Sequence, residues 1–455
     1  MKKTKIGFLP LYLKLYDDVD PSLRNAFSGF VRTMEDTLKS RASVVNPGIV
    51  ATKTGARTME DLFRKENVSA VFTLHLAYSQ SYLVSEALAR LNLPVFMLDA
   101  TKDSGFQKMK PDFLMNNHGI HGVMDLASVL HAKGVAYNVI AGQVNDSSFL
   151  KKVGSAVDST RLAAGFMGQI VGLTGQPFEM MGDFEVPFKR LSKMFGVNVV
   201  RISDRLLLDL SGKIKRAAVS KVVAEDRKRF AMGHTRQSDH EDSVRVYLAL
   251  KQLATTNRLS AYTMNFLDTR KIAAPFYAAN RLMEDGLGYA GEGDVLTALL
   301  AKPLREISKN VTFSEFFCPD WKRGLILMSH MGEINPAFAC RGEKGSLRPK
   351  KAFGGEKNSL YHRFTVKPGK ATFVNISKTA AGFKLVTGAG EIVKAPLYEC
   401  LDTPQFVFRP RLELPDFLEQ YSLAGGGHHI YLAESDVVSD VLNLGTAMNM
   451  QVLKI

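Results

Sequence analysis

The chain has 455 residues, of which 45% are hydrophobic and 23% are charged. This is the composition of a globular protein, and it excludes a wholly disordered chain, a collagen-like repeat and a disulfide scaffold. Lysine and arginine number 59 against 45 acidic residues, so the net charge is +14. The basic residues are scattered and mostly have acidic neighbours, which favours an ordinary charged surface over a nucleic-acid-binding tract. We therefore expect no nucleic-acid partner.

The three cysteines and the first residues of the chain bear on its compartment. Cys318, Cys340 and Cys400 include no Cys-x-x-Cys pair, so the sequence supports neither a disulfide framework nor a zinc knuckle. The first residues begin like a signal peptide, but Pro10 and Lys14 interrupt the apolar stretch and no small-residue cleavage site follows. No stretch reaches the roughly 18 uncharged apolar residues of a membrane-spanning helix. We expect a cytoplasmic protein with no membrane partner.

Strand and helix patterns alternate in the first third of the chain. The predicted strands are 5–9, 70–74, 94–98 and 137–140, and the predicted helices are 21–39, 82–90 and 121–133. Continuous apolar strands of this kind are typical of a parallel sheet that helices cover on both faces. The alternation therefore predicts a doubly wound α/β domain over 1–158. His75 follows the strand at 70–74, where polar residues of such sheets face a ligand crevice.

A second α/β segment and a β-rich segment follow. Strands are predicted at 161–166, 197–202 and 261–266, with a long helix ending near Leu253 and another at 275–285. After these, short β-like runs alternate with Gly- and Lys-rich turns, at 364–366, 371–374, 383–386 and 391–393. The predicted fold class is α/β, with two doubly wound parallel-sheet domains (1–158 and 159–310) followed by a mostly antiparallel β domain (311–455).

Two segments place an acidic residue where a hydrophobic core does not require one. Glu292 lies between Gly291 and Gly293 just before a predicted helix, and the neighbouring Asp294 is interpreted as the cap of that helix. Glu315 lies within an aromatic, strand-like run at 313–317. A buried carboxylate is costly without a partner, so Glu315 either faces solvent or has a cation nearby.

Two further segments carry histidines. His330 ends an apolar strand and Glu333 follows it, while His428 and His429 follow three glycines. The plainer alternatives are a structural histidine and a surface turn. No spacing among these residues matches a local metal motif, so any metal site must be assembled by the fold. Two carboxylates with two imidazoles would suit Mn²⁺ or a similar divalent cation.

These segments together resemble the L-arabinose isomerase family, which is related in fold to L-fucose isomerase. The resemblance rests on motifs that occur in the family's order, namely Arg-Leu-Met at 281–283 followed by Gly-Tyr-Ala-Gly-Glu-Gly-Asp at 288–294, Thr-Phe-Ser-Glu at 312–315, Ser-His-Met-Gly-Glu at 329–333, and Ala-Gly-Gly-Gly-His-His at 424–429. Weaker counterparts lie at 74–75, 117–122 and 266–268.

The resemblance implies a metal-dependent aldose–ketose isomerase, an intramolecular oxidoreductase acting through an enediolate on a pentose or deoxyhexose such as L-arabinose. It implies that Glu292 and Glu315 are the catalytic pair. The metal ligands that it implies, for Mn²⁺ or a similar ion, are Glu292, Glu315, His330 and His429. Residues expected near the substrate are His121, Phe266, His428 and His118. A homo-oligomer, trimer or hexamer, is also expected, in which a neighbouring subunit's N-terminal domain completes the active site.

The segments that contact the sugar depart from the family. Residues 9–14 and 164–168 match the family poorly, and Asn117-His118 stands where the family has Asn-Gln. The sugar is therefore left open, and a phosphorylated or acidic sugar ranks below a neutral one. The alternatives are an epimerase or lyase that uses the same metal shell, and a non-catalytic carbohydrate-binding paralogue.

Overall fold

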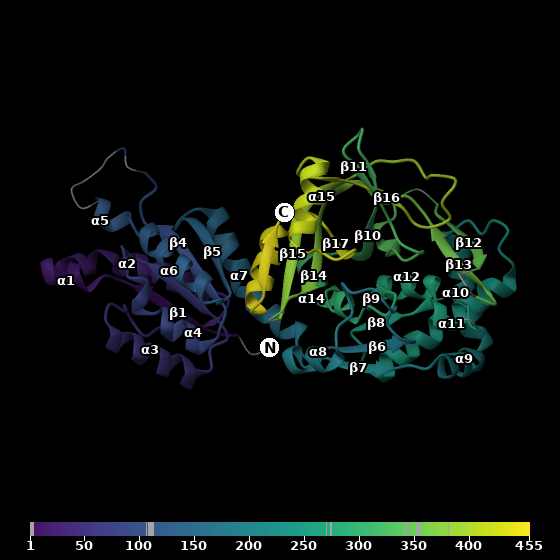
Figure 1. Ribbon diagram of the computed structural model, residues 1–455, viewed down its shortest axis with the longest axis horizontal. Coiled ribbons are helices and arrows are strands. Elements are labelled where there is room, and N and C mark those ends of the chain that lie inside the picture. Colours follow the sequence, from purple (N-terminus) through teal and green to yellow (C-terminus); the bar gives the residue numbers. More distant parts are fainter. Residues whose placement is uncertain are drawn as a thin grey trace. The chain divides into compact units, whose positions relative to one another are not determined.

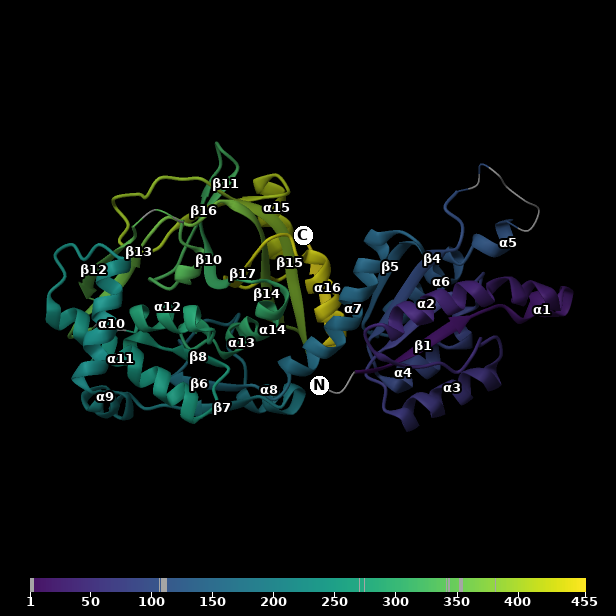
Figure 2. The ribbon, with the colours of Figure 1, turned by 180° about the vertical axis from the view of Figure 1, so that it is seen from behind.

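The computed structural model describes residues 4–455 apart from 106, 108–112, 270, 274, 341, 343, 352–354 and 381. The chain forms two compact units, drawn from opposite sides in Figures 1 and 2. The N-terminal unit comprises Met1–Ala164 and Ser439–Val452, and the C-terminal unit comprises Gly165–Val438 and Leu453–Ile455. The finer division into three domains stays a prediction.

The N-terminal unit is built on a five-stranded parallel sheet of order β2-β1-β3-β4-β5. Its strands are β1 (Lys5–Leu11), β2 (Ser43–Val45), β3 (Val71–His75), β4 (Val95–Thr101) and β5 (Tyr137–Gln143). Apolar residues of α2 (Ser28–Lys39) and α7 (Ser147–Phe166) pack on one face. Those of α3 (Lys53–Glu66), α4 (Ser85–Leu91) and α6 (Ile120–Ala132) pack on the other (Figure 1). The predicted doubly wound sheet is confirmed.

The remaining elements of the N-terminal unit are α1 (Lys14–Val19), η1 (Pro21–Phe27), η2 (Ser81–Leu83), α5 (Phe113–Asn117) and α16 (Val438–Ala447).

The strand expected at 161–166 is wrong, because these residues form the end of α7. The buried side chains of this helix include Phe149, Val153, Ala156 and Ala163. They recur at helical spacing, so they form one apolar stripe against the sheet. A six-residue window is too short to distinguish this stripe from a buried strand.

His75 is enclosed and does not face a crevice, which corrects the expectation from its place at a strand end. It is the last residue of β3 and only 2% exposed, and its Nδ1 lies 2.8 Å from the hydroxyl of Ser79. A Cβ added to Gly119 would lie 2.2 Å from the His75 carbonyl oxygen, so the backbone before α6 packs directly on this strand end. Burial lowers the pKa of His75 to about 3, and the ring is neutral at physiological pH.

The C-terminal unit begins with a four-stranded parallel sheet of order β7-β6-β8-β9. Its strands are β6 (Ile170–Thr174), β7 (Asn198–Arg201), β8 (Ala261–Met264) and β9 (Gly288–Gly291). Its helices are α8 (Phe188–Phe195), α9 (Asp204–Lys213), α10 (Arg216–Arg229), α11 (Gln237–Thr256), η3 (Phe266–Asp268), α12 (Phe276–Asp285), α13 (Val295–Ala298) and α14 (Ala301–Ile307). The helix predicted at 275–285 ends as expected, with Gly286 at a φ of +102° in the left-handed cap position.

A buried ionic cluster joins three of these helices. The Asp226 carboxylate of α10 is fully buried and accepts hydrogen bonds from His240 Nε2 of α11 (2.8 Å), and from Tyr277 Oη and Arg281 Nη1 of α12 (2.5 Å each). Burial by itself raises the pKa of Asp226, but these donors outweigh it and lower the pKa below its usual value. The carboxylate therefore stays ionised, and its loss would leave buried donors unpaired.

A β-barrel follows the parallel sheet. Its strand order is β14-β17-β10-β11-β16-β15, a pairing of β14 with β15 closes it, and β18 adds to β15. The strands are β10 (Val311–Asp320), β11 (Leu325–Ser329), β14 (Gly369–Lys378), β15 (Phe383–Val393), β16 (Phe406–Pro410), β17 (His429–Glu434) and β18 (Gln451–Lys454). The other elements are η4 (Pro336–Phe338), the hairpin of β12 (Ser346–Lys351) and β13 (Asn358–Arg363), and α15 (Leu414–Leu423). The barrel pairs are antiparallel, as predicted.

Two strand predictions in this region need correction. Residues 383–386 and 391–393 belong to one continuous strand, β15, because the glycines between them are not a turn. Added Cβ atoms at Gly388 and Gly390 would lie 2.8 Å from Phe373 and 2.2 Å from Phe408, so both glycines admit core rings. Residues 364–366 form only isolated bridges.

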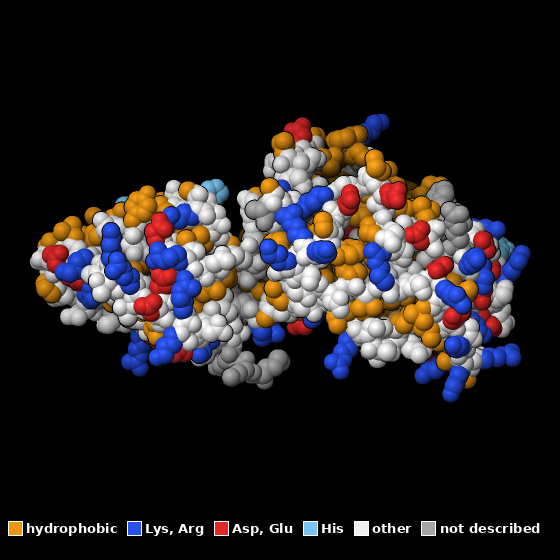
Figure 3. All heavy atoms as spheres, turned by 60° about the horizontal axis from the view of Figure 1, so that its bottom comes forward, with side chains coloured by type: hydrophobic (Ala, Val, Ile, Leu, Met, Phe, Trp, Pro, Cys, Tyr) orange, Lys and Arg blue, Asp and Glu red, His pale blue; other side chains and the backbone are white. Residues whose placement is uncertain are grey.

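The surface drawn in Figure 3 carries basic and acidic side chains interspersed over both units. This distribution matches the scattered charges of the sequence. Among the residues described, none of the helices combines the length and apolar character needed to span a bilayer.

Candidate active site

The sheet register brings three of the four predicted metal ligands together. Glu315 of β10 is paired with His429 of β17 on one side and with Ser329 of β11 on the other, and His330 follows Ser329 directly. Directly opposed residues of neighbouring strands have Cβ atoms about 4.5–5.5 Å apart. Glu292 comes from a different element, the carboxyl end of β9, where parallel sheets place their functional groups.

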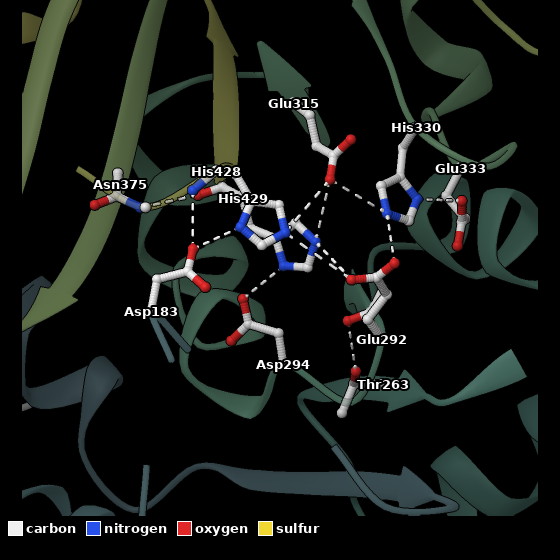
Figure 4. A network of polar contacts seen from close by, with 12 residues as sticks. Asp183, Thr263, Glu292, Asp294, Glu315, His330, Glu333, Asn375, His428 and His429 are labelled. Atoms are coloured by element: carbon white, nitrogen blue, oxygen red, sulfur yellow. Dashed lines mark hydrogen bonds and ion pairs between the residues drawn. The ribbon is translucent and has the colours of Figure 1, made fainter. Parts of the chain in front are cut away.

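The four side chains face one common point (Figure 4). His429 Nε2 lies 3.4 Å from Glu315 Oε1 and 3.7 Å from Glu292 Oε2. His330 Nε2 lies 3.6 Å from Glu315 Oε1 and 3.9 Å from Glu292 Oε1. Two ligand atoms that are each about 2.1 Å from one ion lie roughly 3.4 Å apart at a tetrahedral angle, and these glutamate–histidine spacings are close to that value. Ligand atoms of Glu292, His330 and His429 all lie within 4.8 Å of one another, and so do those of Glu315, His428 and His429, so the two groups share His429.

The buried polar atoms at this point fit a metal ion. Glu292 Oε2, His330 Nε2 and His429 Nε2 are buried without a hydrogen-bond partner in the part of the chain that the structure describes. The other ring nitrogens are satisfied, since His330 Nδ1 donates to Glu333 (2.6 Å) and His429 Nδ1 donates to Asp294 (2.9 Å). Carboxylates that hold the far side of an imidazole in this way are typical of metal-binding histidines.

The electrostatics of the cluster lead to the same conclusion. Burial by itself lowers the pKa of His330, but the carboxylates of Glu333, Glu315 and Glu292 raise it to about 9. Burial raises the pKa of Glu315, but the imidazoles of His330 and His429 bring it below its usual value. The carboxylates thus stabilise positive charge at this point, which a bound divalent cation would supply in place of protons.

Glu292 is held in an unusual backbone conformation. Its φ is +61°, in the left-handed region that non-glycine residues rarely adopt. A Cβ at Gly291 would lie 2.6 Å from His330 Cε1, and one at Gly293 would lie 2.5 Å from the Pro177 backbone. The two glycines flanking Glu292 therefore permit close packing on both sides of a strained residue, and such strain is common at functional sites.

Asp294 has two roles. Its Oδ1 accepts a hydrogen bond from Thr297 N (2.8 Å), which confirms it as the cap of α13. Its Oδ2 meets His429 Nδ1, a contact that the sequence pattern did not indicate. One carboxylate thus fixes both the start of a helix and the orientation of a candidate ligand.

His428 faces the same point from the mouth of the site. Its Nε2 lies 3.7 Å from Glu315 Oε1 and 3.9 Å from Glu292 Oε2, and its side chain is 40% exposed. Asp183 holds it, because one oxygen accepts from both His428 Nδ1 (2.6 Å) and His428 N (3.0 Å). Burial by itself lowers the pKa of His428, but Asp183 and the two glutamates raise it to about 10. Sequence reasoning missed Asp183, which lies outside any helix or strand and has no periodic pattern around it.

The other residues expected near the substrate are not part of this cluster. Phe266 lies in η3 of the C-terminal unit, where it is buried with its ring 5.2 Å from that of Phe178. His118 and His121 belong to the N-terminal unit, where His118 Nε2 lies 2.9 Å from Tyr16 Oη. Contact of these three residues with substrate stays a prediction.

Comparison with known proteins identifies relatives of the chain. Family profiles match at residues 191–310, for the L-arabinose isomerase central domain, and at 310–451, for the L-arabinose isomerase C-terminal domain. The chain is 25% identical to the L-arabinose isomerase of Nocardioides sp. over 407 residues, which are 86% of this chain and 81% of that protein. It is 23% identical to L-arabinose isomerase 1 of Bacillus licheniformis, over 86% of this chain and 82% of that protein. It is 33% identical to the L-arabinose isomerase of Leuconostoc mesenteroides over about half of each chain (49% and 50%). The two profiles together match more than half of the chain, which therefore belongs to the L-arabinose isomerase family as a divergent member.

Proposed function

We propose that the protein is a divalent-metal-dependent aldose–ketose isomerase acting on a pentose or deoxyhexose such as L-arabinose. The observation that carries this proposal is the convergence of Glu292, Glu315, His330 and His429, whose buried atoms Glu292 Oε2, His330 Nε2 and His429 Nε2 have no hydrogen-bond partner among the described residues. Membership of the family supports the reaction class. The mixed carboxylate and imidazole set favours Mn²⁺ or a similar ion.

Two carboxylates suit the proton transfers of this reaction. Moving a carbonyl group between C1 and C2 requires removal of a proton from the carbon beside it and return of a proton to the adjacent carbon. Glu292 and Glu315 lie on either side of the same point, each within 4 Å of His429 Nε2, and form the acid/base pair. A divalent ion held by these residues would supply Lewis-acid stabilisation of the negative charge that develops on the sugar oxygens.

The remaining residues of the site position the substrate. His428 lies at the exposed mouth of the site, with Nε2 toward the two glutamates, and contacts a sugar hydroxyl. Asp183 fixes the orientation of this ring through the two hydrogen bonds that its carboxylate accepts. The burial of His330 and His429 keeps bulk water from their side of the site.

Glutamine variants test the acid/base pair. Glu292→Gln and Glu315→Gln keep the size of the side chain but remove its ability to exchange a proton. We expect each to lower turnover by roughly 100-fold to 10,000-fold, with an unchanged circular dichroism spectrum. Glu306→Gln, at an exposed position outside the cluster, is the matched control and should retain activity. Near-normal isomerase activity in both site variants would refute these roles.

Metal analysis and product analysis separate the alternatives. The isomerase should bind one Mn²⁺ per chain by calorimetry and form a ketose from an aldose in a panel of aldopentoses, deoxyhexoses and sugar acids. A non-catalytic carbohydrate-binding paralogue would bind sugar without turnover. An epimerase or lyase would consume the sugar without forming its ketose.

Family membership also supports a homo-oligomer, trimer or hexamer, with active sites shared between subunits. Light scattering measures the assembly. Mixing two inactive variants tests whether active sites are shared between subunits. A His121→Ala subunit would lack the N-terminal contribution to a site and a Glu315→Gln subunit would lack the C-terminal one, so a hybrid would contain some intact sites. We expect hybrids of the two inactive variants to regain measurable turnover. Failure to regain activity in proven hybrids would contradict shared sites.

A further inference from the structure

A cavity of about 210 Å³ lies beside the candidate metal centre in the C-terminal unit. His330 forms part of its wall, so the cavity and the cluster share a side chain. Phe317, Met331 and Leu401 give it an apolar lining. Lysines are the fully charged side chains that line it, and no carboxylate does so among the described residues.

The barrel places this cavity next to Glu315 and His330. Ser329, which lines the cavity, is the cross-strand neighbour of Glu315, so the two share a face of the sheet. Phe317 also lines it and lies two residues beyond Glu315, where a bulge between Phe316 and Cys318 interrupts the pairing of β10 with β11. An extended chain of four C–C bonds spans about 5 Å. A sugar held through its first carbons at the metal centre is therefore long enough to extend to a cavity that adjoins His330.

Lys350 lies on the side of its hairpin that faces the cavity. Tyr361 lines the cavity and is paired across the hairpin with Arg348, and Lys350 lies two residues beyond Arg348 on β12. Residues two apart on a strand share a face, so Lys350 lies on the same face as Arg348. Lys351 also lines the cavity, so two lysines contribute to its wall.

At the edge of the cavity, the positive charges of Lys350 and Arg348 are only partly neutralised by Asp402. Lys350 Nζ lies 3.9 Å from Asp402 Oδ2, and Arg348 Nη1 lies 3.5 Å from Oδ1 of the same carboxylate. Asp402 lies in the chain between Leu401 and Thr403, which both line the cavity. Charge-assisted hydrogen bonds are typically about 2.7–2.9 Å long, so both contacts are loose. Two cations therefore share one carboxylate, and an additional anion at the rim would be stabilised.

We propose that this cavity receives an acidic group on the last carbon of the sugar, and that Lys350 selects it. The inference rests on the proposed isomerase function and names the substrate class, an aldose that ends in a phosphate or a carboxylate. It reverses the ranking that the sequence favoured, because the sequence could not place a lysine beside the site.

Specificity kinetics test the proposal. The measurement is kcat/KM of the Mn²⁺-loaded protein for a neutral aldopentose, its 5-phosphate and the corresponding uronate. We expect kcat/KM for one of the acidic sugars to exceed that for the neutral sugar by at least about tenfold. Comparison of the 5-phosphate with the uronate shows whether the cavity prefers a phosphate or a carboxylate. Lys350→Gln should lower the ratio of acidic to neutral kcat/KM by roughly 10-fold to 100-fold. Lys357→Gln is the matched control and should preserve the ratio, because Lys357 is exposed, pairs with Asp242 (2.9 Å) and does not line the cavity.

Preference for the neutral sugar, or an unchanged ratio in Lys350→Gln, would overturn the proposal. Absence of any turnover would instead refute the isomerase, and the cavity is then tested by calorimetry with arabitol and arabitol 5-phosphate on the Mn²⁺-loaded protein. Tighter binding of the phosphate that Lys350→Gln weakens supports the cavity assignment. Equal or absent binding of the two polyols overturns it.

Discussion

Asp183 tests whether the orientation of His428 matters for turnover. Among the described residues, His428 is the residue of the site that Asp183 contacts. Replacement by alanine removes the acceptor of the His428 Nδ1 and backbone N–H groups, at 2.6 and 3.0 Å. The ring of His428 is then free to turn its Nε2 away from Glu292 and Glu315. We predict lower turnover with an intact metal centre, since none of the four proposed ligands contacts Asp183 directly.

The magnitude follows from the hydrogen bonds lost. A hydrogen bond to a charged group contributes about 1.5–3 kcal/mol. The Asp183 side chain is 34% exposed, so water replaces part of this and the lower end applies. Because 1.4 kcal/mol corresponds to a factor of ten, Asp183→Ala should lower kcat/KM by roughly 10-fold to 30-fold. Losses near this size are usual for residues that orient a functional side chain.

The assay is a double-mutant cycle of kcat/KM with Asp183→Ala, His428→Ala and the double variant. If Asp183 acts through His428, its replacement should cost less than about twofold once His428 is absent. Asp285→Ala is the matched control, since Asp285 is similarly exposed (33%) and its interactions are with Tyr247 and Lys251, away from the site. Mn²⁺ affinity should stay within about twofold of the wild type. Equal losses in both backgrounds, or unchanged turnover in the single variant, would refute the reasoning.

Three further perturbations test the fold and the metal centre. Asp226→Asn should lower the free energy of unfolding by about 3–5 kcal/mol at pH 7 in urea titrations, because it breaks a buried ion pair. Folding lowers the pKa of Asp226, so the difference in stability between wild type and variant should shrink as the pH falls below about 4. A difference in stability that does not change with pH would contradict this assignment. Asp294→Asn should weaken Mn²⁺ binding by roughly 10-fold to 100-fold in calorimetry, and unchanged affinity would show that this carboxylate does not orient a ligand. Gly291→Ala forces a Cβ to 2.6 Å from His330 and should weaken Mn²⁺ binding at least tenfold, whereas Gly165→Ala, in open space, should not.

Much of the architecture could be predicted because burial leaves a clear pattern. The continuous apolar strands around Phe72 and Phe96 are covered on both faces, and they predicted the parallel sheet of the N-terminal unit. The prediction was wrong where the role of a residue depends on side chains that are distant in the sequence. Gly388 and Gly390 look like a turn in the sequence, but they admit aromatic rings from other strands.

The sequence singled out Glu292, Glu315, His330 and His429, which the structure brings together, but it did not predict their geometry. The two flanking glycines singled out Glu292 in the sequence, but its own φ of +61° was not predicted. The pairing of Glu315 with His429 depends on barrel register, which no local spacing encodes. Asp183 meets His428 across 245 positions of the chain, so no local pattern indicates it. The same holds for Lys350, whose significance arises only once β12 lies beside the cavity.

The central claim is that Glu292, Glu315, His330 and His429 bind one divalent cation. Anomalous diffraction from a crystal of the Mn²⁺-loaded protein, collected near the manganese absorption edge, tests this most directly. We predict a single strong peak, with an oxygen or nitrogen atom of each of the four side chains at about 2.0–2.4 Å from it. A peak that two or more of these side chains do not contact, or no peak at saturating Mn²⁺, would contradict it.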